Sequence, residues 1–314
     1  MYGYDNYQKV KEQLEKRREN AIREAEARDA ELRLVSPEIR KIDSELTGTG
    51  LLLFKAACTG GDLSQIKERN TELTKRRCEV LVSLGYPEDY SEIKYTCPVC
   101  CDTGYNGNKI CSCLREALIK ENIRSSGIGN LIEKQSFENF NLSIYTDEET
   151  KKIMSHNLIE AKKYATEFSR DSKNLLLIGT TGTGKTHITT AIAKTIIENG
   201  FEVIYDSAQN VVAAFEYDRF KSGYGQYEAR GEKYLECELL ILDDLGTEFS
   251  NQFTVSCIYN LLNTRLNKGL PTVISTNLGA GELLSRYEDR IYSRILGQDT
   301  VVLRFLGKDN RLSR

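Results

Sequence analysis

The residues with the clearest chemistry form the stretch from Gly179 to Thr186, which reads GTTGTGKT. It matches the phosphate-loop pattern G-x-x-x-x-G-K-[ST] at every fixed position. Glycines let the backbone turn its N–H groups inward around a polyphosphate, and the positive end of a following helix points at the same charge. Lys185 would neutralise the β- and γ-phosphates, and the Thr186 hydroxyl would be a ligand of Mg²⁺. The stretch therefore predicts a site for a nucleoside triphosphate whose contacts come from Gly179, Thr180, Thr181, Gly182, Thr183, Gly184, Lys185 and Thr186.

The residues on either side of this loop indicate a strand before it and a helix after it. Leu175 to Ile178 form an apolar run typical of a buried parallel strand, and a helical pattern begins at Lys185. A glycine-rich turn that matches the pattern by chance would lack this setting, so we prefer the phosphate-loop interpretation. His187 follows in the helix. We include it among the positions at the nucleotide site, where we expect it to pack or cap and not to catalyse.

Two carboxylates follow a second apolar strand, Glu238 to Leu242. Ligands bind at the carboxyl ends of strands in parallel sheets, where Asp243 and Asp244 would lie. Asp243 would hold Mg²⁺ directly or through water, and Asp244 would orient or deprotonate the attacking water. Such a pair also suits an ordinary turn, but its position beyond a phosphate loop and a βαβ pattern favours the metal site. The side chain of Asp244 is one methylene shorter than that of a glutamate, which suggests slow turnover.

Three further polar groups lie closer to the C-terminus. Asn277 follows another apolar strand, where its amide would read the γ-phosphate and align water; the alternative is a helix N-cap before Gly279. Arg290 and Arg294 are four residues apart and share one helical face. Their planar guanidinium groups suit contact with phosphate on a neighbouring chain. Arg311 follows the last predicted strand, in the run GKDNR.

A second site is predicted by five cysteines within 17 residues. Cys97 and Cys100 form a C-x-x-C knuckle, a glycine-bearing hairpin follows, and Cys111 and Cys113 complete a set that can hold tetrahedral Zn²⁺. Cys101 would point elsewhere, or would replace Cys100. Reduced thiols without a metal are the first alternative, although crowded thiols are prone to oxidation. A redox C-x-x-C is the second, but no thioredoxin-like strand pattern surrounds it. Four sulfur ligands leave no open position, so the zinc would be structural.

The bulk composition sets the class of protein. With 314 residues, 40% of them hydrophobic and 28% charged, the chain suits one or two ordinary globular domains. The net charge of −3 gives no global basic field, so any contact with DNA requires a local patch. No apolar run approaches the length of a membrane span, and the first residues have no apolar signal core. We therefore expect a cytoplasmic protein without membrane contact, whose nine cysteines form no disulfide framework.

The chain is predicted to contain four parts. Residues 1–95 are helical, with a charge-laced first helix; residues 96–114 hold the zinc element; and residues 115–135 form a linker helix. From residue 136 onward strands alternate with helices, which predicts an α/β domain with a parallel sheet over residues 136–314.

A contact with single-stranded DNA is predicted for the helix that begins at Ala208. Aromatic residues there alternate with cations, a composition that can stack bases and neutralise phosphates without reading sequence. Arg219 and Lys221 are the candidates for phosphate contact. Phe215 and Phe220 are better explained as the apolar face of an amphipathic helix.

Together, the segments GTTGTGKTH, LLILDDLG, ISTN, DRIYSRI and GKDNR resemble the DnaC/DnaI helicase-loader branch of the AAA+ ATPases, with the IstB transposition ATPases as close relatives. The resemblance covers residues 136–314 in detail. The C-P-x-C…C-x-C element is similar to that of DnaC-like proteins from Gram-positive bacteria. The resemblance implies that Asn277 is sensor 1, Arg294 the arginine finger, Arg290 its neighbour at a subunit interface and Arg311 sensor 2.

The resemblance also implies an activity. It predicts hydrolysis of Mg²⁺-bound ATP, with Lys185, Asp244, Asn277 and Arg294 as the catalytic residues and self-association through AAA+ interfaces. It predicts a short AAA+ module without a separate helical lid. The N-terminal domain would bind the hexameric replicative helicase and help to place it on single-stranded DNA in replication initiation or restart. No motif in residues 1–90 identifies this partner independently.

Two other functions compete with this interpretation. A transposition helper of the IstB type would polymerise on double-stranded DNA and recruit a transposase; the N-terminal helices and zinc element favour the loader over it. A metabolic phosphate-loop kinase would not need Asn277 as a sensor or an arginine such as Arg294 from a neighbouring chain.

Overall fold

The computed structural model describes residues 3–59, 64–221, 229–307 and 309 of the 314-residue chain, with the backbone alone at residues 51, 53–59 and 221. The chain divides into two compact units. One comprises Met1–Val10 with Arg115–Arg314, and the other comprises Lys11–Leu114. The division of functions among the four predicted parts stays a prediction.

The first three helices form the helical N-terminal region that the sequence predicts. They are α1 (Tyr4–Val35), α2 (Pro37–Thr59) and α3 (Ser64–Ser83). The narrow apolar stripe of α1 is buried along its whole length, at Val10, Leu14, Ala21, Ala25 and Leu32. Arg77 of α3 joins the helices of the Lys11–Leu114 unit, because it donates to Asp29 over 2.7 Å and to Asp43 over 2.8 Å.

A small hairpin follows these helices. Strands β1 (Tyr105–Asn106) and β2 (Lys109–Ile110) pair antiparallel, with Tyr105 opposite Ile110. Next along the chain are the helix α4 (Ser112–Ser125), the single helical turn α5 (Leu131–Lys134) and the 3₁₀ turn η1 (Leu142–Ile144).

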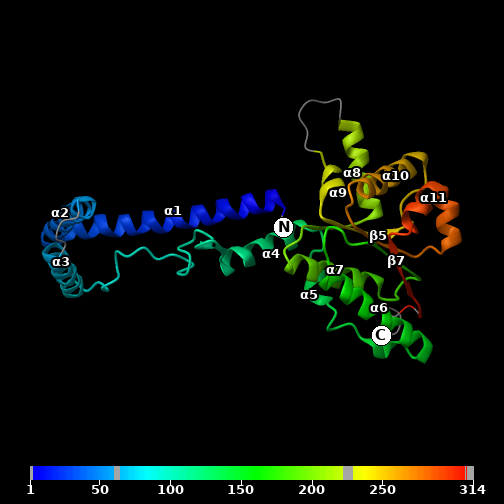
Figure 1. Cartoon of the computed structure of the whole chain (residues 1–314), viewed down its shortest axis with the longest axis horizontal. Helices are drawn as coiled ribbons and strands as arrows, with labels where there is room; N and C mark the ends of the chain where they lie inside the picture. Colours follow the sequence, from blue (N-terminus) through cyan, green and yellow to red (C-terminus); the bar gives the residue numbers. More distant parts are fainter. Residues whose placement is uncertain (1–2, 60–63, 222–228, 308, 310–314) are drawn as a thin grey trace. The chain divides into compact units, whose positions relative to one another are not determined.

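The remaining chain builds a five-stranded parallel sheet in the order β4-β5-β6-β3-β7, which confirms the predicted α/β class (Figure 1). The strands are β3 (Asn174–Gly179), β4 (Val203–Ser207), β5 (Leu239–Leu245), β6 (Thr272–Thr276) and β7 (Thr300–Phe305). The helices are α6 (Glu148–Thr166), α7 (Lys185–Glu198), α8 (Ala208–Lys221), α9 (Glu232–Glu236), α10 (Gln252–Asn267) and α11 (Ala280–Ile295). β3 is flanked by β6 and β7, so the loop that follows β3 opens at the carboxyl ends of these strands.

Alternate residues of each strand enter two apolar cores, one on each face of the sheet. Leu175 and Leu177 pack in the core that includes α6 and α7, whereas Leu176 packs in the core that includes α8, α10 and α11. Both faces of these strands are therefore covered, which explains their continuous apolar runs.

One fully buried cation stabilises the second core. Arg265 of α10 is 0% exposed, and its guanidinium donates to Thr272 Oγ1 and to the carbonyl oxygens of Tyr234, Cys237 and Pro271 over 2.7–3.1 Å. Burial lowers the pKa of Arg265 from its ordinary value. The carbonyl oxygens take the place of the water that the guanidinium loses on folding.

The long helix α11 is broken near its middle. Glu288 has φ 60° and ψ 171°, so the helix consists of two short helices joined at a kink. The sequence predicts short helices in this region, and Arg290 and Arg294 lie on the second of them.

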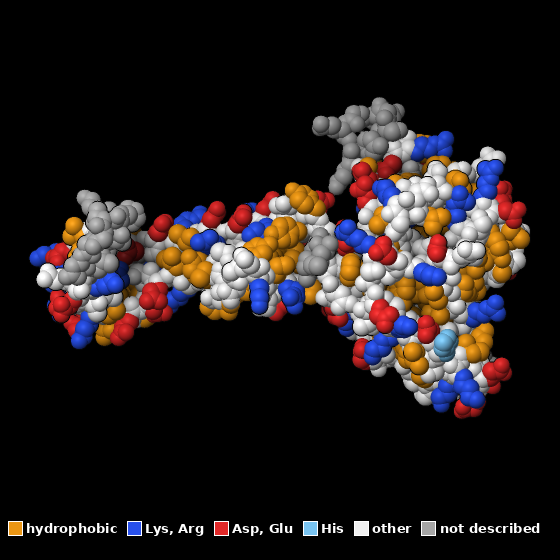
Figure 2. Space-filling model, viewed as in Figure 1, with side chains coloured by type: hydrophobic (Ala, Val, Ile, Leu, Met, Phe, Trp, Pro, Cys, Tyr) orange, Lys and Arg blue, Asp and Glu red, His pale blue; other side chains and the backbone are white. Residues whose placement is uncertain are grey.

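Charges are mixed on the surface. Figure 2 shows basic and acidic side chains interspersed over the visible face of the described residues. Among the described helices, none is both long and apolar enough to cross a membrane.

Candidate nucleotide and zinc sites

The loop between β3 and α7 requires its glycines. Gly182 and Gly184 have φ values of 77° and 92°, in the left-handed region that favours glycine. A Cβ atom at Gly184 would lie 3.0 Å from the Phe140 ring, and one at Gly182 would clash with the Asp309 side chain. The Tyr145 hydroxyl donates to the Thr183 carbonyl oxygen over 3.0 Å, which fixes the loop from outside the sheet.

Lys185 lies at the centre of the site. It is 5% exposed, and its Nζ donates to the carbonyl oxygens of Gly179 and Thr180 over 2.6 and 2.9 Å, and to Asn277 Oδ1 over 2.6 Å. The predicted sensor thus meets the predicted phosphate-binding lysine directly. The N-cap of α11 is Gly279 and not Asn277, so the alternative capping role of Asn277 is wrong.

Asp243 is held by three hydroxyl groups. Ser275 donates to Oδ1, Tyr205 donates to Oδ2 over 2.6 Å, and Thr186 Oγ1 lies 3.5 Å from Oδ2. Burial, and next the Asp243 carboxylate, raise the pKa of Tyr205, so its hydroxyl keeps the proton that it donates. Carboxylate and hydroxyl oxygens so close together fit the hard ligands that Mg²⁺ requires. Tyr205 of β4 and Ser275 of β6, the strands on either side of β5, are not among the residues that the sequence predicts for this site.

Asp244 occupies an irregular point of the sheet. It has φ 53°, and the pairing of β5 with β6 shifts register between Leu242 and Leu245. Its N–H donates to Ser275 Oγ over 3.0 Å, and Thr247 N–H donates to its carbonyl oxygen over 3.2 Å. This bulge turns two successive carboxylates toward the loop, although side chains in a regular strand would alternate between the faces.

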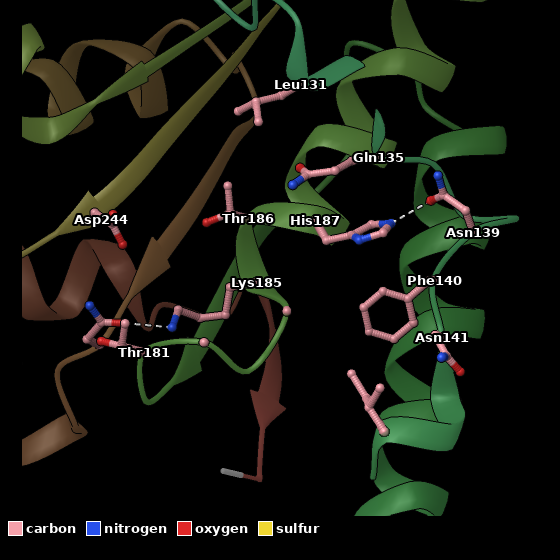
Figure 3. A pocket seen from close by; sticks show the side chains of 14 residues that line it. Leu131, Gln135, Asn139, Phe140, Asn141, Thr181, Lys185, Thr186, His187 and Asp244 are labelled. Atoms are coloured by element: carbon pink, nitrogen blue, oxygen red, sulfur yellow. Dashed lines mark hydrogen bonds between the residues drawn. The ribbon is translucent and has the colours of Figure 1, made fainter. Parts of the chain in front are cut away.

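Lys185, Thr186, Asp244 and Asn277 line a cavity of about 600 Å³. Figure 3 shows Asp244, Thr186 and Lys185 on one side of the cavity and Asn139 and Phe140 on the other. The cavity combines phosphate-loop residues with segments that the sequence analysis did not single out, namely Leu131, Gln135, Asn139, Phe140, Asn141 and Ile144. A cavity with a polar, glycine-rich end and a partly apolar end suits a nucleotide, whose phosphates and base differ in the same way.

His187 lines the same cavity and contacts the segment before α6. Its Nε2 lies 2.8 Å from the Ser136 carbonyl oxygen and 2.9 Å from Asn139 Oδ1 (Figure 3). The ring of Phe140 packs edge-on against the imidazole with 5.2 Å between centroids. These contacts agree with a packing role.

The other predicted site residues lie apart from this cavity. Arg294 is not among the described residues that line it; its guanidinium donates to Asn263 Oδ1 over 2.7 and 3.0 Å and lies 4.5 Å from the centroid of the Tyr259 ring. Arg290 is exposed on the same half of α11. Arg311 lies outside the described residues.

The two predicted DNA contacts lie on α8. The Arg219 guanidinium lies 5.1 Å from the centroid of the Phe253 ring, and the side chain of Lys221 is outside the described residues. The neighbouring Phe220 is 69% exposed, so it does not form the buried apolar face that the sequence suggests.

The four predicted zinc ligands converge. Cys97, Cys100, Cys111 and Cys113 place their sulfur atoms within 4.8 Å of one another, whereas Cys101 is exposed. Thiolates bound to one tetrahedral Zn²⁺ would be about 3.8 Å apart, from a Zn–S distance of about 2.3 Å. The sulfurs of Cys97 and Cys111 are 3.8 Å apart and those of Cys100 and Cys113 are 3.4 Å apart, which is close to the spacing that this metal requires.

The surroundings of the cysteines support a closed metal site. Asp102 is 1% exposed and accepts from the N–H groups of Thr96 and Cys97 over 2.8 and 3.0 Å, which shapes the knuckle. The backbone N–H of Cys100 lowers the pKa of Cys97 to about 7, while burial raises the pKa of Cys113. Zinc binding would require Cys113 to lose its proton. Coordination favours this loss, because the metal ion stabilises the thiolate.

Residues 119–300, more than half of the chain, match the model of the family described as IstB-like ATP binding protein. The chain belongs to this family. Among curated relatives of this IstB-like chain, the replicative helicase loader DnaC of Escherichia coli K12 is 23% identical over 181 residues, which cover 58% of this chain and 71% of the relative. The uncharacterized protein YqaM of Bacillus subtilis is 28% identical over 206 residues, 60% of each chain.

The IstB-like chain is also similar to solved structures. The crystal structure of the DnaC helicase loader has a TM-score of 0.45 and 22% identity, and the match covers 54% of this chain and 98% of that one. The family match and the sequence relatives confirm the predicted resemblance to the DnaC-type AAA+ proteins and their IstB relatives. The chain is therefore an ATP-binding protein of the phosphate-loop type.

Proposed function

We propose that this chain is an ATP-dependent helicase loader, which binds a replicative DNA helicase and assists its loading onto single-stranded DNA in replication initiation or restart. The observation that carries the ATP-dependent part is the meeting of Lys185 with Asn277 in a cavity that Asp244 also lines. The relation to DnaC supports the loader part.

In the proposed mechanism each group has one task. The N–H groups of the loop and Lys185 bind the phosphates of ATP, and Lys185 exchanges its carbonyl partners for phosphate oxygens. Thr186 and Asp243 would hold Mg²⁺, which supplies positive charge against the charge that develops on the phosphates. Asp244 orients the attacking water, and Asn277 contacts the γ-phosphate. Turnover is slow, since the aspartate arm at position 244 is short.

Arg294 is proposed to complete the site of a neighbouring chain. A guanidinium stabilises the transition state of phosphoryl transfer when it contacts the oxygens between the β- and γ-phosphates. In the single chain the guanidinium of Arg294 donates to Asn263, to the Tyr259 hydroxyl and to the Arg290 carbonyl oxygen, all neutral acceptors that a charged phosphate would replace readily. Hydrolysis would then require self-association, with Arg290 exposed at the same interface.

The N-terminal parts are proposed to serve the partner. Residues 1–95 would bind the helicase hexamer, residues 96–114 would hold structural zinc, and residues 115–135 would link both to the ATPase domain at residues 136–314. Single-stranded DNA would contact α8 through Arg219 and Lys221. Arg219 packs against Phe253 in the single chain, so it would contact a phosphate while its guanidinium remains stacked.

A loading assay tests the proposal. The full-length protein and ATP are incubated with the replicative helicase of the same organism and circular single-stranded DNA, and helicase bound to the circles is measured. We expect the wild-type protein to increase loading and Lys185→Ala to fail. Wild-type loading no higher than that of helicase alone would contradict the proposal.

The match to the IstB-like family favours one second candidate, a transposition helper. Such a protein would form ATP-dependent filaments on double-stranded DNA and would recruit a transposase. Electron microscopy with duplex and single-stranded DNA distinguishes the two candidates. Filaments on duplex DNA without helicase binding would favour the transposition helper.

A further inference from the structure

Tyr205 of β4 has two strong hydrogen bonds that run in different directions. Its hydroxyl donates to Asp243 Oδ2 over 2.6 Å, and its backbone N–H donates to the Ser126 carbonyl oxygen over 2.6 Å. The side chain is buried and also contacts Thr189 Oγ1 over 3.1 Å. One residue therefore joins the carboxylate at the nucleotide site to the segment that follows α4.

We propose that Tyr205 is a positioning residue that orients Asp243 toward Mg²⁺, and that the Ser126–Gly127 segment sets the position of Tyr205. The proposal rests on the proposed function, because it assumes that Asp243 binds Mg²⁺. It adds a route by which the segment after α4 controls the affinity of the nucleotide site for the metal.

The hydroxyl of Tyr205 restricts rotation of the Asp243 carboxylate. Ser275 holds Oδ1, and Tyr205 holds the second oxygen, Oδ2, which is also the one that faces Thr186. Without the tyrosine hydroxyl, Oδ2 would keep only the longer contact to Thr186. A ligand oxygen that is not fixed by an outer partner binds its metal more weakly, typically by about 10- to 100-fold.

Among the described strands β4 lies at an edge of the sheet, so its outer backbone groups pair with none of the other described strands. At Tyr205 the pairing comes from Ser126, which is fully buried and is fixed in turn. The N–H of Ser126 donates to the Asn122 carbonyl oxygen over 2.9 Å. Its hydroxyl donates to the Ile123 carbonyl oxygen over 2.8 Å. A displacement of the end of α4 would therefore move the edge strand at Tyr205.

Gly127 shows how closely the two segments approach. It has φ 84°, and a Cβ atom there would clash with the Tyr205 carbonyl oxygen. Gly129, two residues later, also has a positive φ of 58°, but nothing lies within 4 Å of the position of its Cβ atom. Alanine at either site strains the backbone, yet only alanine at Gly127 pushes on Tyr205. Gly129→Ala is thus a matched control for Gly127→Ala.

The chain connects this contact to the predicted zinc element. α4 runs from Ser112 to Ser125, so it contains Cys113 near its beginning and leads directly into Ser126. Force applied to the chain at the zinc element would pass along a single helix to the contact with Tyr205. This path gives a partner bound to the N-terminal residues a mechanical means of changing the affinity for Mg²⁺.

The test measures binding of a fluorescent ATP analogue to the full-length protein while Mg²⁺ is titrated, with a parallel measurement in EDTA. Tyr205→Phe should raise the Mg²⁺ concentration at half-maximal binding by about 10-fold. Affinity in EDTA should stay at the wild-type value, which also shows that the variant is folded. Gly127→Ala should raise the midpoint as well, Gly129→Ala should not, and Gly127→Ala should add nothing in a Tyr205→Phe background.

The outcomes separate this proposal from the proposed function. A wild-type protein whose binding ignores Mg²⁺ would contradict the assignment of Asp243 itself. Wild-type dependence on Mg²⁺ together with an unchanged midpoint in Tyr205→Phe would overturn the role of Tyr205 alone. Equal midpoints for the two glycine variants, or additive effects of Gly127→Ala and Tyr205→Phe, would overturn the link to the segment after α4.

Discussion

Lys185 Nζ donates to Asn277 Oδ1 over 2.6 Å, although the two residues follow different strands. Those strands, β3 and β6, are neighbours in the parallel sheet, and so their carboxyl ends lie side by side. A terminal phosphate oxygen bound next to this pair could therefore contact both the ammonium group and the amide.

Lys185→Ala should abolish ATP binding, because it removes the cation that the loop holds through the carbonyl oxygens of Gly179 and Thr180. A titration with a fluorescent ATP analogue measures the affinity. Lys194→Ala, on the same helix, is the control and should bind as the wild type does. Wild-type affinity in Lys185→Ala would show that the nucleotide binds elsewhere.

Asp244→Ala should keep ATP affinity near the wild-type value and should slow hydrolysis by about 100-fold or more, the scale of lost general-base catalysis. Thr186 and Asp243 remain available to Mg²⁺, so binding does not depend on residue 244. Phosphate release under conditions of saturating ATP measures the rate. Normal turnover would assign the water-orienting role to another residue.

The finger role of Arg294 predicts complementation between two inactive proteins. Arg294→Ala should bind ATP normally and hydrolyse it about 10³-fold more slowly, and a mixture with Lys185→Ala should recover activity. A mixed interface pairs the intact loop of one chain with the intact arginine of the other. For the same reason, wild-type activity should rise more steeply than linearly with protein concentration.

Asn263→Ala provides the control for Arg294. It removes the amide that accepts two of the hydrogen bonds of the guanidinium within the chain but leaves the arginine in place. Activity should survive in this variant if Arg294 acts on a neighbouring chain. The finger role would be contradicted if Asn263→Ala lost as much activity as Arg294→Ala and if co-assembled Arg294→Ala and Lys185→Ala recovered none. Arg294 would then be a residue that only packs within its own chain.

Protein purified without added metal should contain about one zinc per chain, as a site with four sulfur ligands requires. Cys97→Ser combined with Cys100→Ser should release the metal and make the Lys11–Leu114 unit sensitive to protease, since structural zinc contributes about 10 kcal/mol or more to folding in small domains. Cys101→Ser, with its exposed side chain, should retain zinc. Mass spectrometry under native conditions can count the metal, and retention in the double variant would reveal other ligands.

Glu121 predicts a pH dependence of stability. Hydrogen bonds from Arg124 and then from Lys9 lower its pKa to about 2 from an ordinary 4.5. A carboxylate whose pKa is lower in the folded state stabilises the fold above about pH 4.5 and loses this contribution as the pH falls toward 2. The difference in melting temperature between the wild type and Glu121→Gln should therefore be largest near neutral pH and narrow below 4.5. A difference in melting temperature between the wild type and Glu121→Gln that stays constant over this pH range would contradict this origin.

The sheet and the phosphate loop could be predicted because their signals are local. Apolar runs such as Leu175 to Ile178 reflect burial on both faces, and the loop pattern needs specific residues within one turn. The four-cysteine cluster is of the same kind, since its ligands are close in the sequence. Such features can be recognised without knowing which strands become neighbours.

The features that the sequence did not reveal depend on the order of strands. Tyr205 and Ser275 reach Asp243 only because β4 and β6 lie on either side of β5. The far side of the cavity, around Phe140, comes from irregular backbone with no periodic pattern. Arg265 would be expected on a helix surface, and only the carbonyl oxygens of distant segments explain its burial.

The left-handed backbone at Asp244 has a consequence for how such a protein can change over generations. A glycine there would relieve backbone strain of about 1 kcal/mol, so selection for thermal stability alone would favour it. The same exchange would remove the carboxylate that the bulge presents to the cavity. Directed evolution of this chain for thermal stability, without selection for ATP hydrolysis, should therefore accumulate glycine at position 244. The selected variants would unfold at a higher temperature but would hydrolyse ATP poorly.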